Sequence, residues 1–128
     1  MKSKRPVNLD IGTIDLPLAA WTSITHRISG VVIFAGIAVL LFLFNLSLSG
    51  EAGFERAQQL LGSALARLVV WAILSALAYH MVAGCKHLLL DFGVGESKAA
   101  GPVGAKVVIA ISAVLIVLLG VWLEVWKW

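Results

Sequence analysis

The sequence is short of charge. Only 13% of its 128 residues are Asp, Glu, Lys or Arg, whereas 60% are hydrophobic, and the mean hydropathy is +0.97. A water-soluble chain of this size buries only about 65% of its surface, so this composition would leave large apolar patches in water. The scarcity of charge therefore excludes an ordinary soluble domain and favours a protein surrounded by membrane lipid.

Cysteine is also scarce, and the basic residues do not cluster. The single thiol of Cys85 cannot close an internal disulfide, and no cysteine pair offers a metal site. The ten Lys and Arg give a net charge of +3, but they flank apolar runs instead of forming a patch. This distribution excludes a nucleic-acid-binding protein. The sequence also has no internal repeat and no low-complexity segment.

Three uncharged runs are long enough to cross a bilayer as helices. They are 28–50, 68–85 and 107–123, which at 1.5 Å per residue reach about 34, 27 and 26 Å. Short polar connectors separate them. The sequence therefore predicts an all-α membrane protein with three transmembrane helices, the second extending on the cytoplasmic side to residue 91. Residues 1–27 form a cytoplasmic segment that includes the start of the first helix.

The ends of the spans indicate their orientation. Seven Lys and Arg lie in the N-terminal segment and the second connector, and three lie in the first connector and at the C-terminus. The positive-inside rule then places the N-terminus in the cytoplasm and the C-terminus outside. Trp122, Trp126 and Trp128 at the end of the third span are typical of an interfacial anchor. The first apolar run begins too far from the N-terminus for a cleaved secretory signal.

Ser23, His26 and Arg27 form a first polar cluster at the inner start of the first span. Their i, i+3 and i, i+4 spacings place them on one helix face, where they could share a ligand. The alternative is that Thr22 or Ser23 caps the helix and that the Arg27 side chain reaches the lipid headgroups. The residues alone leave both readings open.

His80, His87 and Asp91 form a second cluster on one face of the second span. His80 lies six positions before Lys86, or about 9 Å inside the span, where an ionisable side chain needs a partner. A hydrogen bond to another helix would satisfy it, and ligation of a metal, above all haem iron, is the stronger alternative. Ala83 and Gly84 are small, which would admit either a flat macrocycle or a packed helix.

If His80 ligates haem, the second axial ligand is expected from another chain. Two nitrogens bound trans to one iron lie only about 4 Å apart, whereas His87 is about 10 Å from His80 along the helix. His26, at the membrane interface, is expected to be shallower than His80 and poorly placed. This protein would then supply half of a cofactor site.

Three segments carry a resemblance to a known family. They are Arg5-Pro6-Val7-Asn8-Leu9-Asp10, the run Ser23-Ile24-Thr25-His26-Arg27-Ile28-Ser29-Gly30, and Ala78-Tyr79-His80 followed by Gly84, His87 and Asp91. With these the chain resembles the large cytochrome b subunit of succinate dehydrogenase, the membrane anchor of respiratory complex II. The third span matches only as an apolar helix.

The resemblance implies a multi-pass subunit of the bacterial inner membrane. Its expected partners are a flavoprotein that oxidises succinate, an iron–sulfur subunit and a smaller membrane anchor that supplies the second haem ligand. It also implies that His80 is an axial ligand of haem b and that His26 and Arg27 lie near the haem propionates. Ser23 and Arg27 would line the ubiquinone pocket. Lys86 stands where relatives often carry arginine, which would weaken a fork-like contact with a carboxylate.

Two other functions remain open at this point. One is the anchor of a quinol:fumarate reductase, which uses the same parts. The other is a membrane scaffold without a cofactor, in which His80 only packs against a neighbouring helix and Arg27 only sets the topology.

Overall fold

The computed structural model describes residue 7 and residues 9–126. After a short 3-10 turn, η1 (Ile11–Thr13), the chain forms four α-helices: α1 (Leu18–Leu48), α2 (Glu51–Leu61), α3 (Ala64–Asp91) and α4 (Ala100–Val125). No strand occurs in these ranges. The predicted all-α fold is confirmed.

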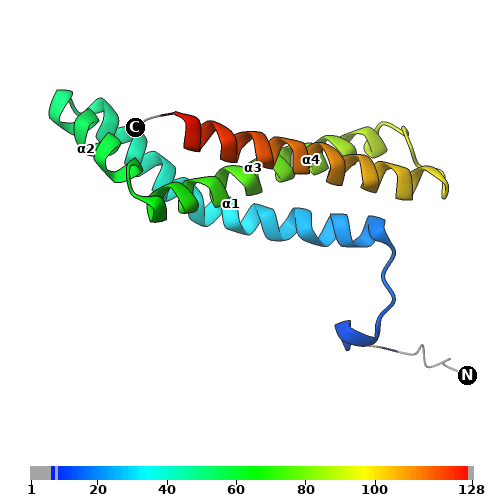
Figure 1. The fold of residues 1–128 in the computed structure, drawn as a ribbon. Coiled ribbons are helices and arrows are strands. Elements are labelled where there is room, and N and C mark those ends of the chain that lie inside the picture. The colour runs from blue at the N-terminus through cyan, green and yellow to red at the C-terminus, as the bar shows by residue number, and fades with distance from the viewer. Residues whose placement is uncertain (1–6, 8, 127–128) are drawn as a thin grey trace, which may run out of the picture.

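Three long helices, α1, α3 and α4, lie side by side and form a bundle (Figure 1). Each is long and apolar enough to cross a membrane, with a mean hydropathy of 2.7, 1.9 and 2.7 over its most apolar window. Many large apolar side chains point outward, as lipid would require; Phe34, for example, is 82% exposed. The three predicted spans fall on these helices, except that Ser49 and Gly50 lie beyond the end of α1.

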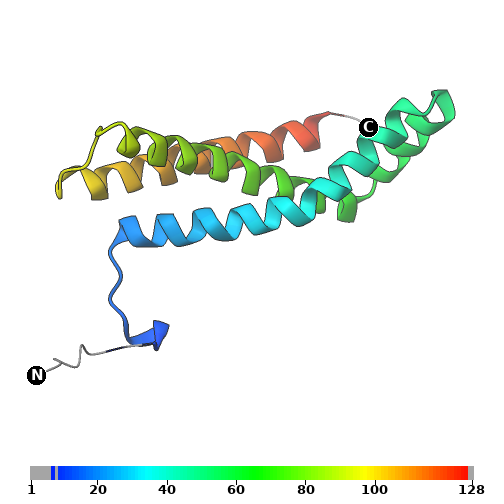
Figure 2. The ribbon, with the colours of Figure 1, turned by 180° about the vertical axis from the view of Figure 1, so that it is seen from behind.

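The two ends of the bundle carry different connections. The start of α1 and the α3–α4 connection lie at one end, while α2 and the end of α4 lie at the other, as the view from behind also shows (Figure 2). This is the arrangement that three membrane crossings require. Trp122 and Trp126 mark the second end with ring centroids 6.3 Å apart. Trp128 lies outside the described residues.

The first connector differs from the prediction, because it contains the helix α2 instead of only a short polar loop. Gly50 makes the reversal between α1 and α2 with a φ of 113°, a conformation that residues with a side chain rarely adopt. The carboxylate of Glu51 in the first turn of α2 stabilises the start of this helix, because it interacts favourably with the positive end of the helix dipole. Ala57 is buried in the structure, while Phe54 remains half exposed.

Close approach of small residues holds the long helices together. Gly36 of α1 is buried against α3, and a Cβ placed on it would come 2.7 Å from Cγ2 of Ile73. On the other side of α3, Trp71 donates its indole N–H to the carbonyl of Ile116 in α4 at 2.9 Å. The contact between α1 and α3 is the one that positions the candidate site described below.

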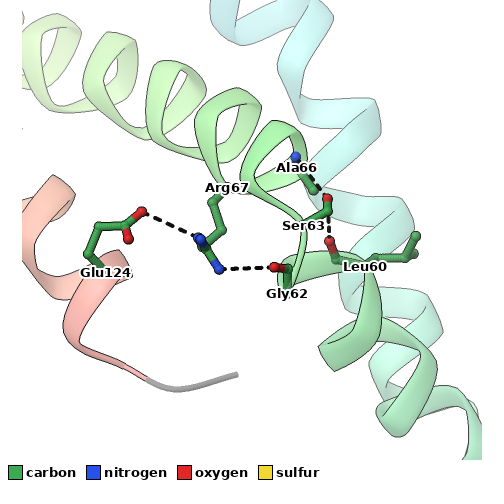
Figure 3. Close-up of polar contacts among 6 residues, drawn as sticks. All are labelled: Leu60, Gly62, Ser63, Ala66, Arg67 and Glu124. Carbon is green, nitrogen blue, oxygen red and sulfur yellow. Dashed lines mark hydrogen bonds and ion pairs between the residues drawn. The ribbon is translucent and has the colours of Figure 1, made fainter.

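At the α2 end, Arg67 connects three helices (Figure 3). Its Nε lies 3.3 Å from a carboxylate oxygen of Glu124 at the end of α4. Its Nη1 donates to the carbonyl of Gly62, which follows α2, at 3.1 Å. Ser63 begins α3 there as its N-cap, accepting from the amide of Ala66 at 3.2 Å.

The helix α1 is longer than the span predicted for it. Its 31 residues correspond to about 46 Å at 1.5 Å per residue, against about 30 Å of hydrocarbon in a bilayer. The helix begins at Leu18, ten residues before the predicted span. Ser23, His26 and Arg27 are therefore all inside it, whereas the positions at which the hydrocarbon begins and ends remain a prediction.

Candidate functional site

The two predicted polar clusters form one site where α1 packs against α3. The ring of His26 from α1 stacks on that of His80 from α3, with centroids 4.1 Å apart and planes 15° apart. The ring of His87, two turns further along α3, has its centroid 5.1 Å from that of His26, with the planes tilted by 47°. No group of His, Cys, Asp and Glu among the described residues can hold a metal ion by itself.

The structure brings the ring of His26 into contact with that of His80, because α1 and α3 cross with Ser29 and Gly30 against His80. That His26 is shallower in the membrane than His80 stays a prediction. The lone pairs of an imidazole lie in the ring plane, so two rings stacked face to face cannot both aim at one iron. That the second ligand comes from another chain therefore stays a prediction. It now rests on the stacked orientation of the two rings instead of on a difference in depth.

His80 is hydrogen-bonded to α1 through one ring nitrogen. Its Nδ1 lies 3.1 Å from the carbonyl oxygen of His26 and 3.0 Å from Oγ of Ser29. A carbonyl can only accept, so Nδ1 carries the hydrogen. The other nitrogen, Nε2, has no hydrogen bond among the described residues and is not among the fully buried polar atoms. His80 therefore presents a lone pair on Nε2 that no described residue uses.

Small residues let the imidazoles come together. A Cβ on Gly30 would lie 3.1 Å from Cε1 of His80, which is tight, and one on Gly84 would lie 3.5 Å from Nε2 of His26. Ala83 is 1% exposed. Of the two uses predicted for Ala83 and Gly84, the structure shows helix packing.

Tyr79, next to His80, makes a second connection between the two helices that the sequence did not reveal. Its hydroxyl donates to the carbonyl of Thr22 at 3.0 Å and lies 2.5 Å from Oγ1 of Thr25. Together with the contacts of His80, this fixes the register of α1 against α3. The only signal in the sequence was a tyrosine placed directly before the candidate ligand.

Ser23 is the hydroxyl residue of α1 that makes no hydrogen bond in the described structure. The other four each bond a carbonyl three or four residues earlier: Thr22, Thr25, Ser29 and Ser47. The capping alternative is wrong for Thr22 and Ser23, because the N-cap of α1 is Pro17 and both residues lie inside the helix. The Ser23 hydroxyl is therefore available to a ligand.

The remaining predicted residues lie at the edge of this site. Arg27 is exposed and has no ion pair among the described residues. Asp91 is the last residue of α3 and is also exposed. The described residues thus offer three groups that could bind a ligand where α1 packs on α3. They are the unpaired cation of Arg27, the free hydroxyl of Ser23 and the unbonded Nε2 of His80.

The sequence of this chain is similar to those of proteins in a known family. The family described as succinate dehydrogenase/fumarate reductase transmembrane subunit matches residues 1–119. The chain is 40% identical over 124 residues to a succinate dehydrogenase cytochrome b556 subunit of Coxiella burnetii, covering 96% of this chain and 99% of that one. It is 32% identical over 117 residues to the protein of the same name from Paracoccus denitrificans, covering 91% and 90%. The chain therefore belongs to the succinate dehydrogenase/fumarate reductase transmembrane subunit family.

Proposed function

We propose that this chain is the membrane anchor of a succinate:quinone oxidoreductase that binds haem b through His80 and forms part of the ubiquinone site with Ser23 and Arg27. The relatives are named as cytochrome b556 subunits of succinate dehydrogenase, which supports a b-type haem. The observation that carries the proposal is the state of His80, whose Nδ1 is bonded to α1 while Nε2 is open.

The residues present fit an axial haem ligand. A histidine that binds iron does so as a neutral imidazole, and its second nitrogen is normally held by a carbonyl or another acceptor. His80 has this arrangement through the His26 carbonyl. Since no second imidazole of the described residues can face it across an iron, the other ligand is assigned to a smaller partner anchor. His26 and Arg27 are the groups of this chain nearest the propionates in the proposal.

The bound haem would supply electron transfer, because an iron held by two histidines has no open position for oxygen. The chain's own residues act on the quinone. Ser23 donates its hydroxyl hydrogen to a quinone oxygen, and the Arg27 guanidinium stabilises the negative charge that develops there as electrons arrive. Both lie at the inner end of α1 in the proposed orientation, where protons from the cytoplasm reach the site.

The proposed partners follow from this division of labour. In this proposal a flavoprotein oxidises succinate, and an iron–sulfur subunit delivers the electrons from the cytoplasmic side of a bacterial inner membrane. The family description covers fumarate reductases as well. The anchor of a quinol:fumarate reductase is accordingly the second candidate function.

Replacing His80 tests the haem assignment. In the purified complex, His80→Ala should abolish or strongly weaken the reduced-minus-oxidised b-type haem spectrum, because alanine offers the iron no ligand. Ser47→Ala, near the end of α1 opposite to the site, is the control and should retain the spectrum. An unchanged bis-histidine spectrum in His80→Ala would refute the ligand assignment, and a wild-type complex without any haem signal would support the scaffold alternative.

A further inference from the structure

We infer that Ser29 is a positioning residue for His80, fixing the tautomer and rotation of its imidazole and so tuning the potential of the haem. The inference rests on the proposed function, in which His80 is the ligand. It adds a specific role for a serine that was predicted only as part of the family motif. Ser29 touches neither the iron nor the quinone in this arrangement and acts through His80.

Three short distances define the arrangement. The Oγ of Ser29 lies 2.6 Å from the carbonyl oxygen of His26, to which it donates its single hydrogen. The same Oγ lies 3.0 Å from Nδ1 of His80, and Nδ1 lies 3.1 Å from that carbonyl. Since the hydroxyl hydrogen is already used, Oγ offers a lone pair, and the Nδ1–H of His80 is shared between two acceptors.

The surroundings partly bury this triangle. Ser29 is only 7% exposed, and Gly30 beside it leaves just enough room for Cε1 of His80. The imidazole is thus held at its edge by Ser29 and the His26 carbonyl and at its face by the His26 ring. In a site of low polarity such hydrogen bonds are stronger than in water.

Acceptors on Nδ1–H make the opposite nitrogen a better donor to a metal. A better donor stabilises the oxidised iron more than the reduced iron and lowers the midpoint potential. Removal of the Ser29 hydroxyl leaves the His26 carbonyl as the sole acceptor and gives the ring more rotational freedom. The potential should then rise, and the EPR signal of the oxidised haem, which depends on the orientation of the axial imidazoles, should shift or broaden.

Ser47 provides a matched control on the same helix. Its hydroxyl donates to the carbonyl of Phe44 at 2.7 Å, the same three-residue bond that Ser29 makes, but no other side chain shares it. If the role of Ser29 is only to bond its own helix, then Ser29→Ala and Ser47→Ala will behave alike. If Ser29 positions His80, only Ser29→Ala will change the haem.

The experiment compares Ser29→Ala, Ser29→Thr and Ser47→Ala in the complete membrane complex, by redox titration of the haem absorbance and by EPR of the oxidised haem. We expect Ser29→Ala to retain haem with a more positive potential and a shifted EPR signal. Ser29→Thr, which keeps the hydroxyl, should return both toward wild type, and Ser47→Ala should change neither. A wild-type potential and EPR signal in Ser29→Ala, or the same shift in Ser29→Thr, would overturn the inference.

Two further variants keep the test decisive. If Ser29→Ala does not assemble, Ser29→Cys preserves the volume with a much weaker acceptor and should show a smaller rise in potential; a wild-type potential in that variant refutes the inference. His80→Ala separates this inference from the proposed function. Haem that survives in His80→Ala refutes the ligand itself, whereas haem lost there but unaltered in Ser29→Ala refutes only the positioning role.

Discussion

Ser23 differs from the other hydroxyl residues of α1 because its side chain bonds nothing in the described structure. A serine in a helix normally satisfies itself on a carbonyl of the preceding turn, as Ser29 and Ser47 do. A hydroxyl left free one turn from His26, beside the exposed Arg27, is what a site for a polar quinone oxygen requires. The hydroxyls of α1 that already bond a carbonyl are used within the helix, and the Ser23 hydroxyl is the one left for a ligand.

Ser23→Ala tests the use of that hydroxyl. Losing one donor to a developing oxyanion costs on the order of 10²-fold in rate, so we expect quinone reduction by the complex to fall by about that factor. Succinate oxidation with a soluble acceptor should stay near normal, because that acceptor takes electrons before the quinone site. Steady-state assays with both acceptors measure the difference.

Ser47→Ala is the control for this variant too, since it removes a hydroxyl from the same helix far from the site. Its two activities should match wild type. An assembled Ser23→Ala complex that reduces quinone at the wild-type rate and affinity would show that the quinone binds elsewhere.

The packing of α1 on α3 determines whether His26 and His80 meet at all. Along this contact, Gly36 lies against Ile73, with space for no additional methyl group. The site and this contact lie on the same pair of helices, and His26 and Gly36 are ten residues, or nearly three turns, apart along α1. A change that separates the helices at Gly36 is therefore expected to loosen the histidine cluster as well.

Gly36→Ala should lower the thermal midpoint of the purified complex, because overpacking of this kind costs about 1–3 kcal/mol. Ile73→Ala removes the atoms that the new methyl would meet, so the double variant should lose less stability than the sum of the two single losses. Thermal unfolding in detergent, followed by the release of haem, measures both quantities.

Gly101→Ala is the matched control, because a Cβ on Gly101 meets nothing within 4 Å. It should leave the midpoint unchanged or raise it slightly, since alanine favours a helix over glycine. Equal losses from Gly36→Ala and Gly101→Ala would mean that the close contact at Ile73 has no energetic importance.

The helices could be predicted to different extents, for physical reasons. Long runs without charge specify the three long helices, because lipid demands such runs. The 11-residue helix α2 has polar residues on one face and is too short to span a membrane, so a search for long uncharged runs does not find it.

The contact between His26 and His80 depends on the register between two helices, and the residue spacing within either helix does not determine that register. Pro17, by contrast, is a readable start signal for α1, and with it the capping role of Ser23 could have been rejected from the sequence.

At the scale of the whole molecule, the two ends of the bundle differ in charge and in what they connect. The start of α1 and the α3–α4 connection lie at the same end of the bundle (Figures 1 and 2). Among the described residues, four Lys and Arg lie in or beside this end (Arg27, Lys86, Lys98 and Lys106), and two lie toward the other end (Arg56 and Arg67). The positive-inside rule predicts that the end with more of these residues faces the cytoplasm. In that orientation the histidine cluster would lie nearer the cytoplasm and the Arg67–Glu124 pair on the outer side.

Single-cysteine labelling tests this orientation in a Cys85→Ser background. Glu55→Cys in α2 should react with a membrane-impermeant maleimide added to spheroplasts, and Glu96→Cys in the α3–α4 connection should react only in inverted vesicles, because both side chains are exposed but on opposite sides. Detergent-solubilised protein should label at both positions. Reaction of Glu96→Cys in intact spheroplasts would reverse the orientation.

The early start of α1 carries its polar residues beyond the uncharged run. From Leu18 to Arg27 the helix rises about 15 Å before the uncharged run begins at Ile28, so in the predicted span Ser23 and Arg27 would lie at the boundary between hydrocarbon and water. The two substances consumed in quinone reduction have opposite solubilities: the quinone dissolves in the oil and the proton in the water. A helix whose residues were all apolar up to its first position would keep the quinone and the proton apart. In the proposed function, the ten residues of α1 before Ile28 would let the quinone and the proton meet without either leaving its own phase.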